Sequence, residues 1–172
     1  MKGTMKKSIL VLGLSLALLA ISGSDVLSQA SKEITEPVTL IFYATARALP
    51  MGEDRGFVTL DIFGVLLCDE GKGLFHEATS HTAGSFFREK GVSKDYVIYG
   101  YYLLKNGDKV FVVLNAEIKP GVPAKGKVTI IGGTGKCAGI QGSSECTEFF
   151  LLPAVQGISQ GYFKQPIKYT LS

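Results

Sequence analysis

The sequence contains no tryptophan, only three cysteines and only 19% charged residues, and these shortages exclude several classes of protein. Three cysteines without a Cys-x-x-Cys pair or a neighbouring histidine do not match the ligand spacing of a zinc site. With 46% hydrophobic residues, the composition is that of a packed domain rather than a disordered chain. No amphipathic run of 3.6-residue period is long enough for a helix, so the 172 residues predict one β-rich domain.

A long hydrophobic run is present only near the N-terminus. Three lysines within the first seven residues precede an apolar segment (9–21), and residues 28–30 supply the small side chains that a signal peptidase reads. The apolar segment is shorter than the ~20 residues that a membrane helix needs, and no second one follows. We therefore expect a cleaved signal peptide over 1–30, a mature domain over 31–172 without a stable membrane span, and a secreted or periplasmic protein. A retained membrane anchor is the alternative.

Little net charge remains once this segment is removed. The whole chain carries a formal charge of +3, and residues 1–30 contain three lysines and one aspartate, which leaves +1 for the mature domain. A nearly neutral domain has no positive field to attract nucleic acid or an anionic membrane surface. We expect neither as a partner.

β-branched and aromatic residues form eight strand-like runs: 38–47, 56–68, 96–104, 109–117, 125–131, 147–152, 157–164 and 166–171. In the second run the even positions 58, 60, 62 and 66 are apolar, as in a strand with one face in a core. Eight antiparallel strands close naturally into a barrel, which leaves no strand edge exposed. The fold class is therefore an all-β, eight-stranded antiparallel barrel, with a β-sandwich as the alternative.

Asn106-Gly107 lies between two of these runs and is the strongest hairpin signature in the chain. A two-residue loop at this point pairs Tyr101 with Val112 and puts Tyr99 and Tyr101 on one face of the hairpin. If that face lines the barrel, the tyrosine rings and hydroxyl groups would form part of a small-ligand pocket. Core packing or an oligomer contact would explain the same residues.

Glycine is concentrated directly after the run 125–131. Five glycines fall within residues 132–142: Gly132, Gly133, Gly135, Gly139 and Gly142. Because glycine adopts positive φ and allows close backbone approach, this density predicts a sharp structural corner between two strands. No Walker ending and no helix follow it, so we expect neither a phosphate loop nor a nucleotide cofactor.

The Gly-Gly-Thr-Gly sequence of this corner resembles the GGTG-x-aromatic corner of the allene oxide cyclase and dirigent β-barrels, and of many small secreted bacterial proteins with that barrel. The resemblance covers the corner and the strand before it. It implies an eight-stranded barrel, often oligomeric. Plant cyclases of this group close a ring mainly by holding the substrate in one shape, and dirigent relatives steer radical coupling without oxidising anything. Their working residues do not match positions in this chain, so the resemblance implies no catalytic residue.

Cys137 stands where the plant families have the aromatic residue of this corner. Cys137 and Cys146 flank a short segment, and export would place them where disulfides persist, so we expect a Cys137–Cys146 bridge. This bridge would fasten the corner in place of the aromatic residue. Cys68 is then expected to be a buried apolar thiol.

Residues 74–87 are rich in Thr, Ser and Ala and carry both histidines. In a strand, His76 and His81 would point to opposite faces, so we expect no metal site. Glu77 and His81 would be ~13 Å apart along a strand, too far for a catalytic dyad. Asp61 interrupts an apolar run and needs a partner if it is buried. The candidate ligand-binding residues are Tyr99, Tyr101, Asp61, Glu77 and His81.

These features predict an exported, non-catalytic barrel that binds a small apolar or aromatic ligand or acts as a dirigent-like scaffold, with homo-oligomer formation and no cofactor. One alternative is a cyclase-like or isomerase-like enzyme that works by shape, with Asp61, Glu77 or a tyrosine as the polar helper. Another is a purely structural envelope protein.

Overall fold

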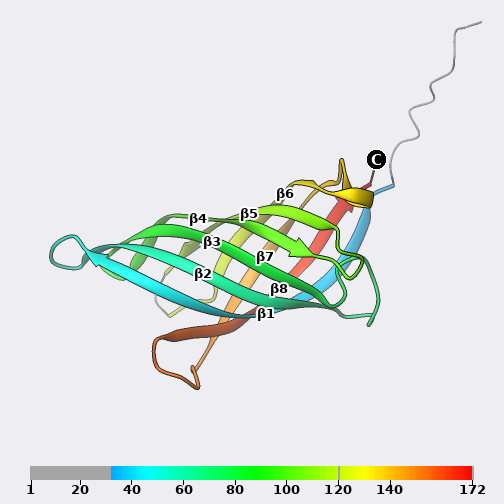
Figure 1. The fold of residues 1–172 in the computed structure, drawn as a ribbon. Coiled ribbons are helices and arrows are strands. Elements are labelled where there is room, and N and C mark those ends of the chain that lie inside the picture. Colours follow the sequence, from blue (N-terminus) through cyan, green and yellow to red (C-terminus); the bar gives the residue numbers. More distant parts are fainter. Residues whose placement is uncertain (1–31, 120, 172) are drawn as a thin grey trace, which may run out of the picture. The chain divides into compact units, whose positions relative to one another are not determined.

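The computed structural model describes residues 32–119 and 121–171, which form a closed antiparallel β-barrel (Figure 1). The strands follow one another around the barrel in chain order, and the last pairs with the first. They are β1 (Ile34–Pro50), β2 (Arg55–Cys68), β3 (Ala78–Glu89), β4 (Val92–Leu103), β5 (Lys109–Ile118), β6 (Ala124–Gly133), β7 (Gln141–Leu151) and β8 (Ile158–Thr170). The predicted barrel is confirmed, and the closed sheet rules out the sandwich.

The signal peptide predicted over 1–30 lies outside the described residues. Within the described residues, none of the helical segments has the length and apolar character that a bilayer crossing requires.

Two strands differ from the prediction. The segment rich in Thr, Ser and Ala supplies β3, which begins at Ala78, and the two closing runs form one continuous strand, β8. β8 continues through Pro166, whose partner on β1 is Pro37. Neither proline has an N–H group, so this pair leaves no backbone donor without an acceptor. On its other side, β8 pairs with β7 from Thr170 to Lys168 and again from Lys164 to Gln160.

The β4–β5 hairpin has a three-residue loop, so the predicted two-residue loop is wrong. The amide of Leu104 donates to the carbonyl of Asp108 (2.9 Å), and the amide of Gly107 donates to the carbonyl of Leu104 (2.9 Å). The usual three-residue hairpin loop is a turn followed by one residue in the left-handed conformation. Gly107, with φ at +85°, is that residue. Tyr101 therefore pairs with Phe111. This one-residue shift moves the tyrosines to the other face of the sheet.

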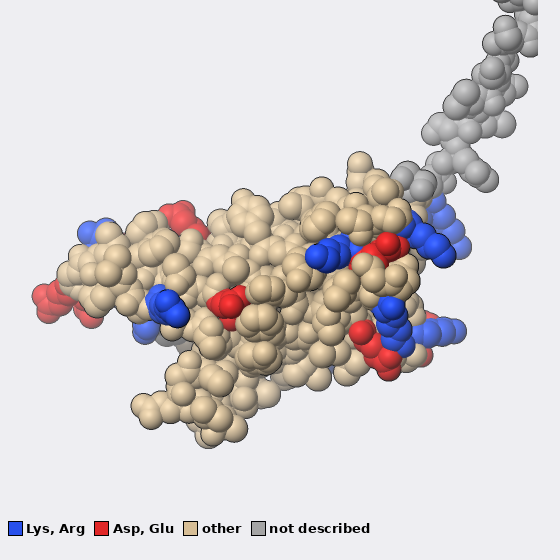
Figure 2. All heavy atoms as spheres, viewed as in Figure 1, with Lys and Arg blue, Asp and Glu red and all other residues tan. Residues whose placement is uncertain are grey.

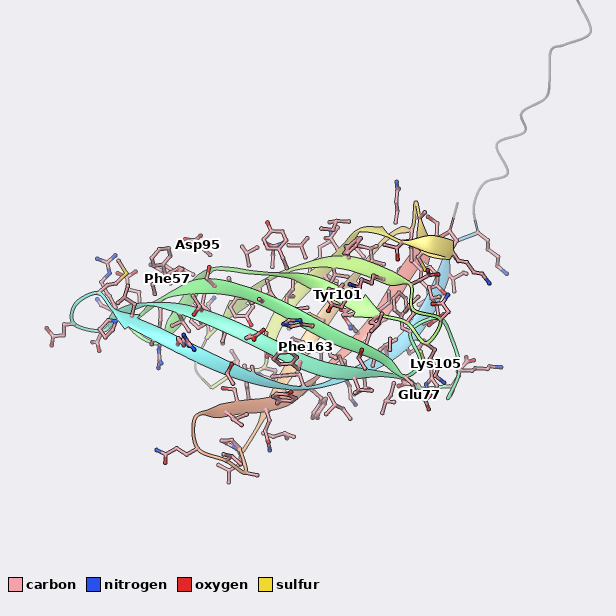
Figure 3. The ribbon with its side chains drawn as sticks, in the orientation of Figure 1. Phe57, Glu77, Asp95, Tyr101, Lys105 and Phe163 are labelled. Atoms are coloured by element: carbon pink, nitrogen blue, oxygen red, sulfur yellow. The ribbon has the colours of Figure 1, made fainter. Side chains whose placement is uncertain are left out.

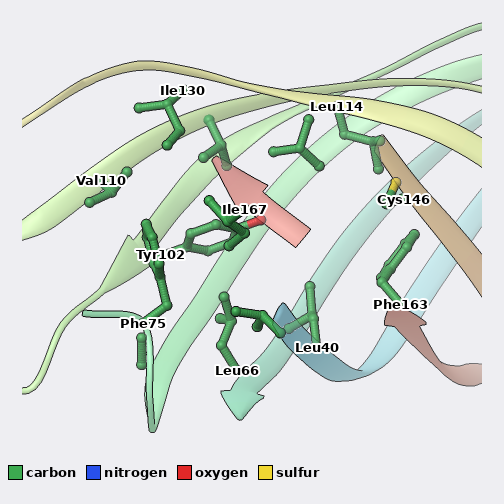
Figure 4. Close-up of a cluster of buried hydrophobic side chains, with 14 of the residues drawn as sticks. Leu40, Leu66, Phe75, Tyr102, Val110, Leu114, Ile130, Cys146, Phe163 and Ile167 are labelled. Carbon is green, nitrogen blue, oxygen red and sulfur yellow. The ribbon is translucent and has the colours of Figure 1, made fainter. Parts of the chain in front are cut away.

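The even-numbered positions of β1 to β5 point into the barrel and form its core (Figure 4). The apolar even positions predicted for the second run are confirmed here, since Val58, Ile62 and Leu66 are buried and Leu60 packs against the core. The rings of Phe42 and Phe163 lie 5.0 Å apart in the barrel interior.

One end of the barrel is closed by the loop between β2 and β3, residues 69–77, which we call the plug loop. Its Phe75 is fully buried and lies edge-on to the rings of Tyr102 (5.9 Å) and Tyr169 (5.4 Å). The carboxylate of Glu36 accepts hydrogen bonds from the amides of Leu74 (2.9 Å) and Phe75 (3.2 Å) and from the hydroxyl of Tyr169 (2.6 Å). Glu36 thereby fixes the plug loop to β1 and β8.

The glycine-rich corner lies at the same end and connects β6 to β7 through a short 3-10 helix, η1 (Gly135–Cys137). Gly135 has φ at +54°, and a Cβ atom there would collide with the carboxylate of Asp108. That carboxylate accepts a hydrogen bond from the amide of Lys136 (3.0 Å). Glycine is therefore required where the corner packs against the β4–β5 hairpin.

The predicted Cys137–Cys146 disulfide is not formed, and all three cysteines are free and buried. Cys137 packs against Gly133, at the end of β6, whereas Cys146 pairs with Gly126 on the same strand. Those two glycines are seven residues apart, or ~23 Å along a strand. Cys137 and Cys146 are close in the sequence but far apart in the structure, because β7 runs from the corner back along the barrel. The third thiol, Cys68, is buried as expected and lies 3.4 Å from Glu36.

Candidate functional site

The opposite end of the barrel is formed by the hairpins β1–β2, β3–β4, β5–β6 and β7–β8, and it contains a cavity of about 350 Å³. We call this the mouth cavity. Its walls are mainly apolar because they consist of inward-facing positions of the strands. The lining includes Phe42, Ala44, Val58, Leu60, Ile62, Phe86, Tyr96, Ile118 and Phe150.

Glu148 is the buried carboxyl group of the mouth cavity. It lies on the inner face of β7 and is only 3% exposed, and its neighbours across the ladder are Ala124 of β6 and Phe163 of β8. Within the described chain, its Oε2 atom has no hydrogen-bond partner. Burial among apolar side chains raises the pKa of Glu148 to about 8, because the charged form loses its hydration. Glu148 is therefore mostly protonated at pH 7 and can donate a hydrogen bond.

Tyr96 adds a second polar group to this cavity. It is 3% exposed, and its ring stacks on that of Phe86 at 5.3 Å. Burial raises the pKa of the Tyr96 phenol, and the nearby carboxyl group of Glu148 raises it further. The hydroxyl group thus stays protonated and is available as a donor or an acceptor.

A smaller cavity of about 30 Å³ lies deeper in the barrel and is bordered by Gln165, Tyr102 and Thr82. Gln165 is 3% exposed, and neither its amide nitrogen nor its amide oxygen makes a hydrogen bond of normal geometry within the described residues. Burial raises the pKa of Tyr102 to about 12, while the adjacent Gln165 side chain opposes this shift. Ile62 borders both this cavity and the mouth cavity.

The cationic side chains near the mouth cavity are exposed to solvent. Arg88 borders the mouth cavity and, together with Lys119 and Val122, an outer groove of about 510 Å³. Glu148 borders both spaces. Burial is the cause of the high pKa of Glu148, so these cations do not stabilise its charged form to a comparable extent.

The tyrosines predicted to line a pocket lie on the outer wall. Tyr99 is 59% exposed, and Tyr101 projects outward with its ring 4.4 Å from the Nζ atom of Lys109 (Figure 3). Both face away from the mouth cavity, as the corrected hairpin register requires.

Asp61 and His81 meet on this outer wall, which the sequence did not predict. The Nε2 atom of His81 lies 2.8 Å from Oδ1 of Asp61, and the imidazole stacks on Phe63 at 4.4 Å. Glu77 is elsewhere, in the turn before β3 with φ at +60°, and forms an ion pair with Lys105 (Figure 3). Glu77 and His81 are therefore not neighbours on one strand face.

His81 and Tyr101 belong to a row of aromatic side chains that crosses β1 to β5 on the outside of the barrel. The row consists of Tyr43, Phe63, His81, Tyr101 and Phe111. We call it the outer aromatic row. Figure 2 shows that the face carrying these strands has few charged side chains. None of these five side chains lines the mouth cavity.

Within the described residues, no three His, Cys, Asp or Glu side chains gather in a way that could hold a metal ion. The mouth cavity, with Glu148 and Tyr96, is therefore the candidate site. Sequence reasoning missed both residues. The available signal was the acidic Glu148 within the aromatic run 147–152, since an acidic residue at an inward position implies burial.

No protein-family model and no curated protein matches the sequence. Among solved structures, the barrel is similar to the pterocarpan synthase dirigent protein GePTS1, with 11% identity and a TM-score of 0.47 over 88% of this chain and 99% of that one. It is also similar to the pterocarpan synthase dirigent protein PsPTS1, with 10% identity and a TM-score of 0.44 over 81% of this chain and 96% of that one. The protein is thus similar to dirigent proteins in fold, and identity this low transfers no activity.

Proposed function

We propose that this protein binds a small apolar or aromatic molecule in the mouth cavity and holds it in a defined orientation, as a dirigent-type scaffold. The observation that carries the proposal is an apolar cavity of about 350 Å³ whose wall contains the buried carboxyl group of Glu148, with one oxygen, Oε2, that has no hydrogen-bond partner among the described residues. Apolar walls with a few fixed polar groups are the usual form of a small-molecule site. The walls supply affinity, and the polar groups orient the ligand.

The position of the cavity supports this function. It occupies the end of the barrel opposite the plug loop, so a ligand can enter between the hairpins while the rest of the core stays packed. We further propose that the protein acts outside the cytoplasm, as the N-terminal sequence predicts, and that removal of residues 1–30 yields the active form.

A second candidate function is a cyclase or isomerase that works on the same bound molecule. The raised pKa of Glu148 favours it, because an acid that keeps its proton at neutral pH can protonate a bound substrate. Tyr96 lies close enough to Glu148 for the carboxyl charge to raise the pKa of its phenol. In this case Glu148 takes the role that the sequence had suggested for Asp61 or Glu77.

Binding is tested with N-phenyl-1-naphthylamine, a neutral aromatic probe whose fluorescence rises in an apolar site. We expect saturable binding to the wild-type protein. Ala46→Trp places a large ring at the cavity entrance and should weaken binding at least about tenfold, because it fills volume that the probe needs. Ala46 is exposed, as is the control position Ala83, so neither substitution places a large side chain in the packed core.

Ala83→Trp is the matched control, since Ala83 lies on β3 and faces outward. Its binding curve should match the wild type. An absence of saturable binding, or equal losses in both variants, would show that the mouth cavity is not the site.

A further inference from the structure

Two buried polar side chains lie next to each other on the inner wall of the barrel. Glu148 pairs with Phe163 across the β7–β8 ladder, and Gln165 lies two residues farther along β8. Residues in this diagonal relation lie ~7–8 Å apart, with their Cβ atoms somewhat closer. Both are only 3% exposed, and each has side-chain atoms without a hydrogen-bond partner in the described part of the chain. A buried polar group without a partner destabilises the folded state, so a partner for Glu148 would stabilise the protein.

The groups around Glu148 determine which partner fits. Facing it are Ala124 on β6, Phe163 on β8 and the phenol of Tyr96 on β4, and the thiol of Cys146 precedes it on β7. Burial raises the pKa of Cys146 to about 12, with the charge of Glu148 adding to the effect, so the thiol and the phenol are both neutral. Arg88 lines the mouth cavity but is itself exposed to solvent, and Lys119 borders only the outer groove. Among the described residues, the buried groups around Glu148 are neutral donors and acceptors, and no lysine or arginine is buried with them.

We propose that the mouth cavity selects uncharged ligands with a carbonyl or ether oxygen, and that this oxygen accepts a hydrogen bond from the carboxyl group of Glu148. The inference rests on the proposed binding function and specifies its ligand class. A pure hydrocarbon leaves the carboxyl proton unpaired, whereas an anion enters a site that has no interior cation to pair with it. A neutral acceptor avoids both costs.

The same geometry makes binding depend on pH. The donor is present while Glu148 is protonated and is lost once the carboxyl group ionises, at about pH 8 in the free protein. The ionised carboxylate both lacks the donor and repels an acceptor oxygen, so the affinity for an acceptor ligand follows the protonated fraction and falls by up to about tenfold between pH 7 and pH 9. A ligand without an acceptor oxygen lacks the hydrogen bond and shows a smaller change.

The test compares two naphthalene probes of similar size, Prodan, which carries a ketone, and N-phenyl-1-naphthylamine, which does not. Prodan emission also shifts to longer wavelength when its ketone accepts a hydrogen bond. With the wild type we expect tighter Prodan binding, a red-shifted component at pH 7, and loss of both toward pH 9. Glu148→Gln keeps a donor that does not titrate, so its Prodan affinity should stay constant over this range.

Glu148→Leu removes the donor and should lower Prodan affinity about fivefold and remove the red-shifted component. Glu145→Gln, on the outward face of the same strand, is the matched control and should keep the wild-type pH profile. Circular dichroism and thermal melting of each variant check that it is folded. If both probes bind but Prodan affinity is independent of pH and of residue 148, the ligand class is wrong while the binding function stands. If neither probe binds, the proposed function itself fails.

Discussion

Replacing Glu148 by glutamine should stabilise the protein, and by an amount that grows with pH. The ordinary pKa of this carboxyl group is 4.5, and burial raises it to about 8 in the folded state. Between these two values the unfolded chain has released the proton while the folded chain still holds it. Since the folded state binds more protons, the free energy of unfolding falls as pH rises from about 4.5 to about 8 and levels off above. Stability from this group is therefore greatest in acid.

The size of the effect follows from the same two pKa values. Each unit of difference corresponds to about 1.36 kcal/mol, so at pH 7 the wild type has lost about 3 kcal/mol relative to acidic solution. Glutamine has nearly the same shape and does not titrate, so the variant avoids this loss. The difference in free energy of unfolding between Glu148→Gln and wild type should thus increase by about 3 kcal/mol between pH 4.5 and pH 7.

Urea denaturation at a series of pH values measures this difference directly, and an unchanged m-value would show that both proteins unfold to similar states. Glu145→Gln serves as the control because Glu145 is exposed on the same strand. A difference between Glu148→Gln and wild type that is independent of pH would refute the reasoning. It would mean that the carboxyl group has a near-ordinary pKa in the folded protein, and the hydrogen-bond donor proposed for the ligand would not exist at neutral pH.

Three further predictions concern the closed end of the barrel and its thiols. Phe75→Ala should lower the free energy of unfolding by about 3–5 kcal/mol, since it empties a fully buried site, whereas Phe87→Ala on the surface should cost much less; similar costs in urea denaturation would contradict the plug. Gly107→Ala should cost about 1–2 kcal/mol from its positive φ alone, because a Cβ there meets no other atom, and a neutral substitution would argue against the three-residue loop. A thiol reagent should react with three cysteines in the unfolded protein and only slowly with the native protein. A single reactive cysteine after unfolding would show that two of the cysteines form a disulfide.

Much of the fold could be predicted from local patterns in the sequence. Alternating apolar residues in 56–68 correctly indicated the inward face of β2, and Asn106-Gly107 correctly marked a hairpin. The loop length was wrong by one residue because Asn-Gly suits both a two-residue turn and a turn with a left-handed glycine. That single step placed Tyr99 and Tyr101 on the wrong face. Register depends on contacts across the whole sheet, which local sequence does not contain.

The candidate site was less accessible to sequence reasoning, since it depends on residues from distant strands. Glu148 becomes unusual only because β6 and β8 place Ala124 and Phe163 beside it. In the same way, the plug loop is a polar turn in the sequence, and Phe75 acquires its role from Tyr102 and Tyr169. The polar residues that stood out, Asp61 and His81, are paired with each other on the surface.

The plug loop has a kinetic consequence for any molecule held at the other end. With Phe75 filling the far end of the described barrel, the mouth cavity is a cup rather than a tunnel, and a bound molecule leaves by the route through which it entered. A competing molecule then cannot push the first one through from behind. One ligand must leave the cavity before the next can enter, and the dissociation rate of one ligand should not increase with the concentration of another.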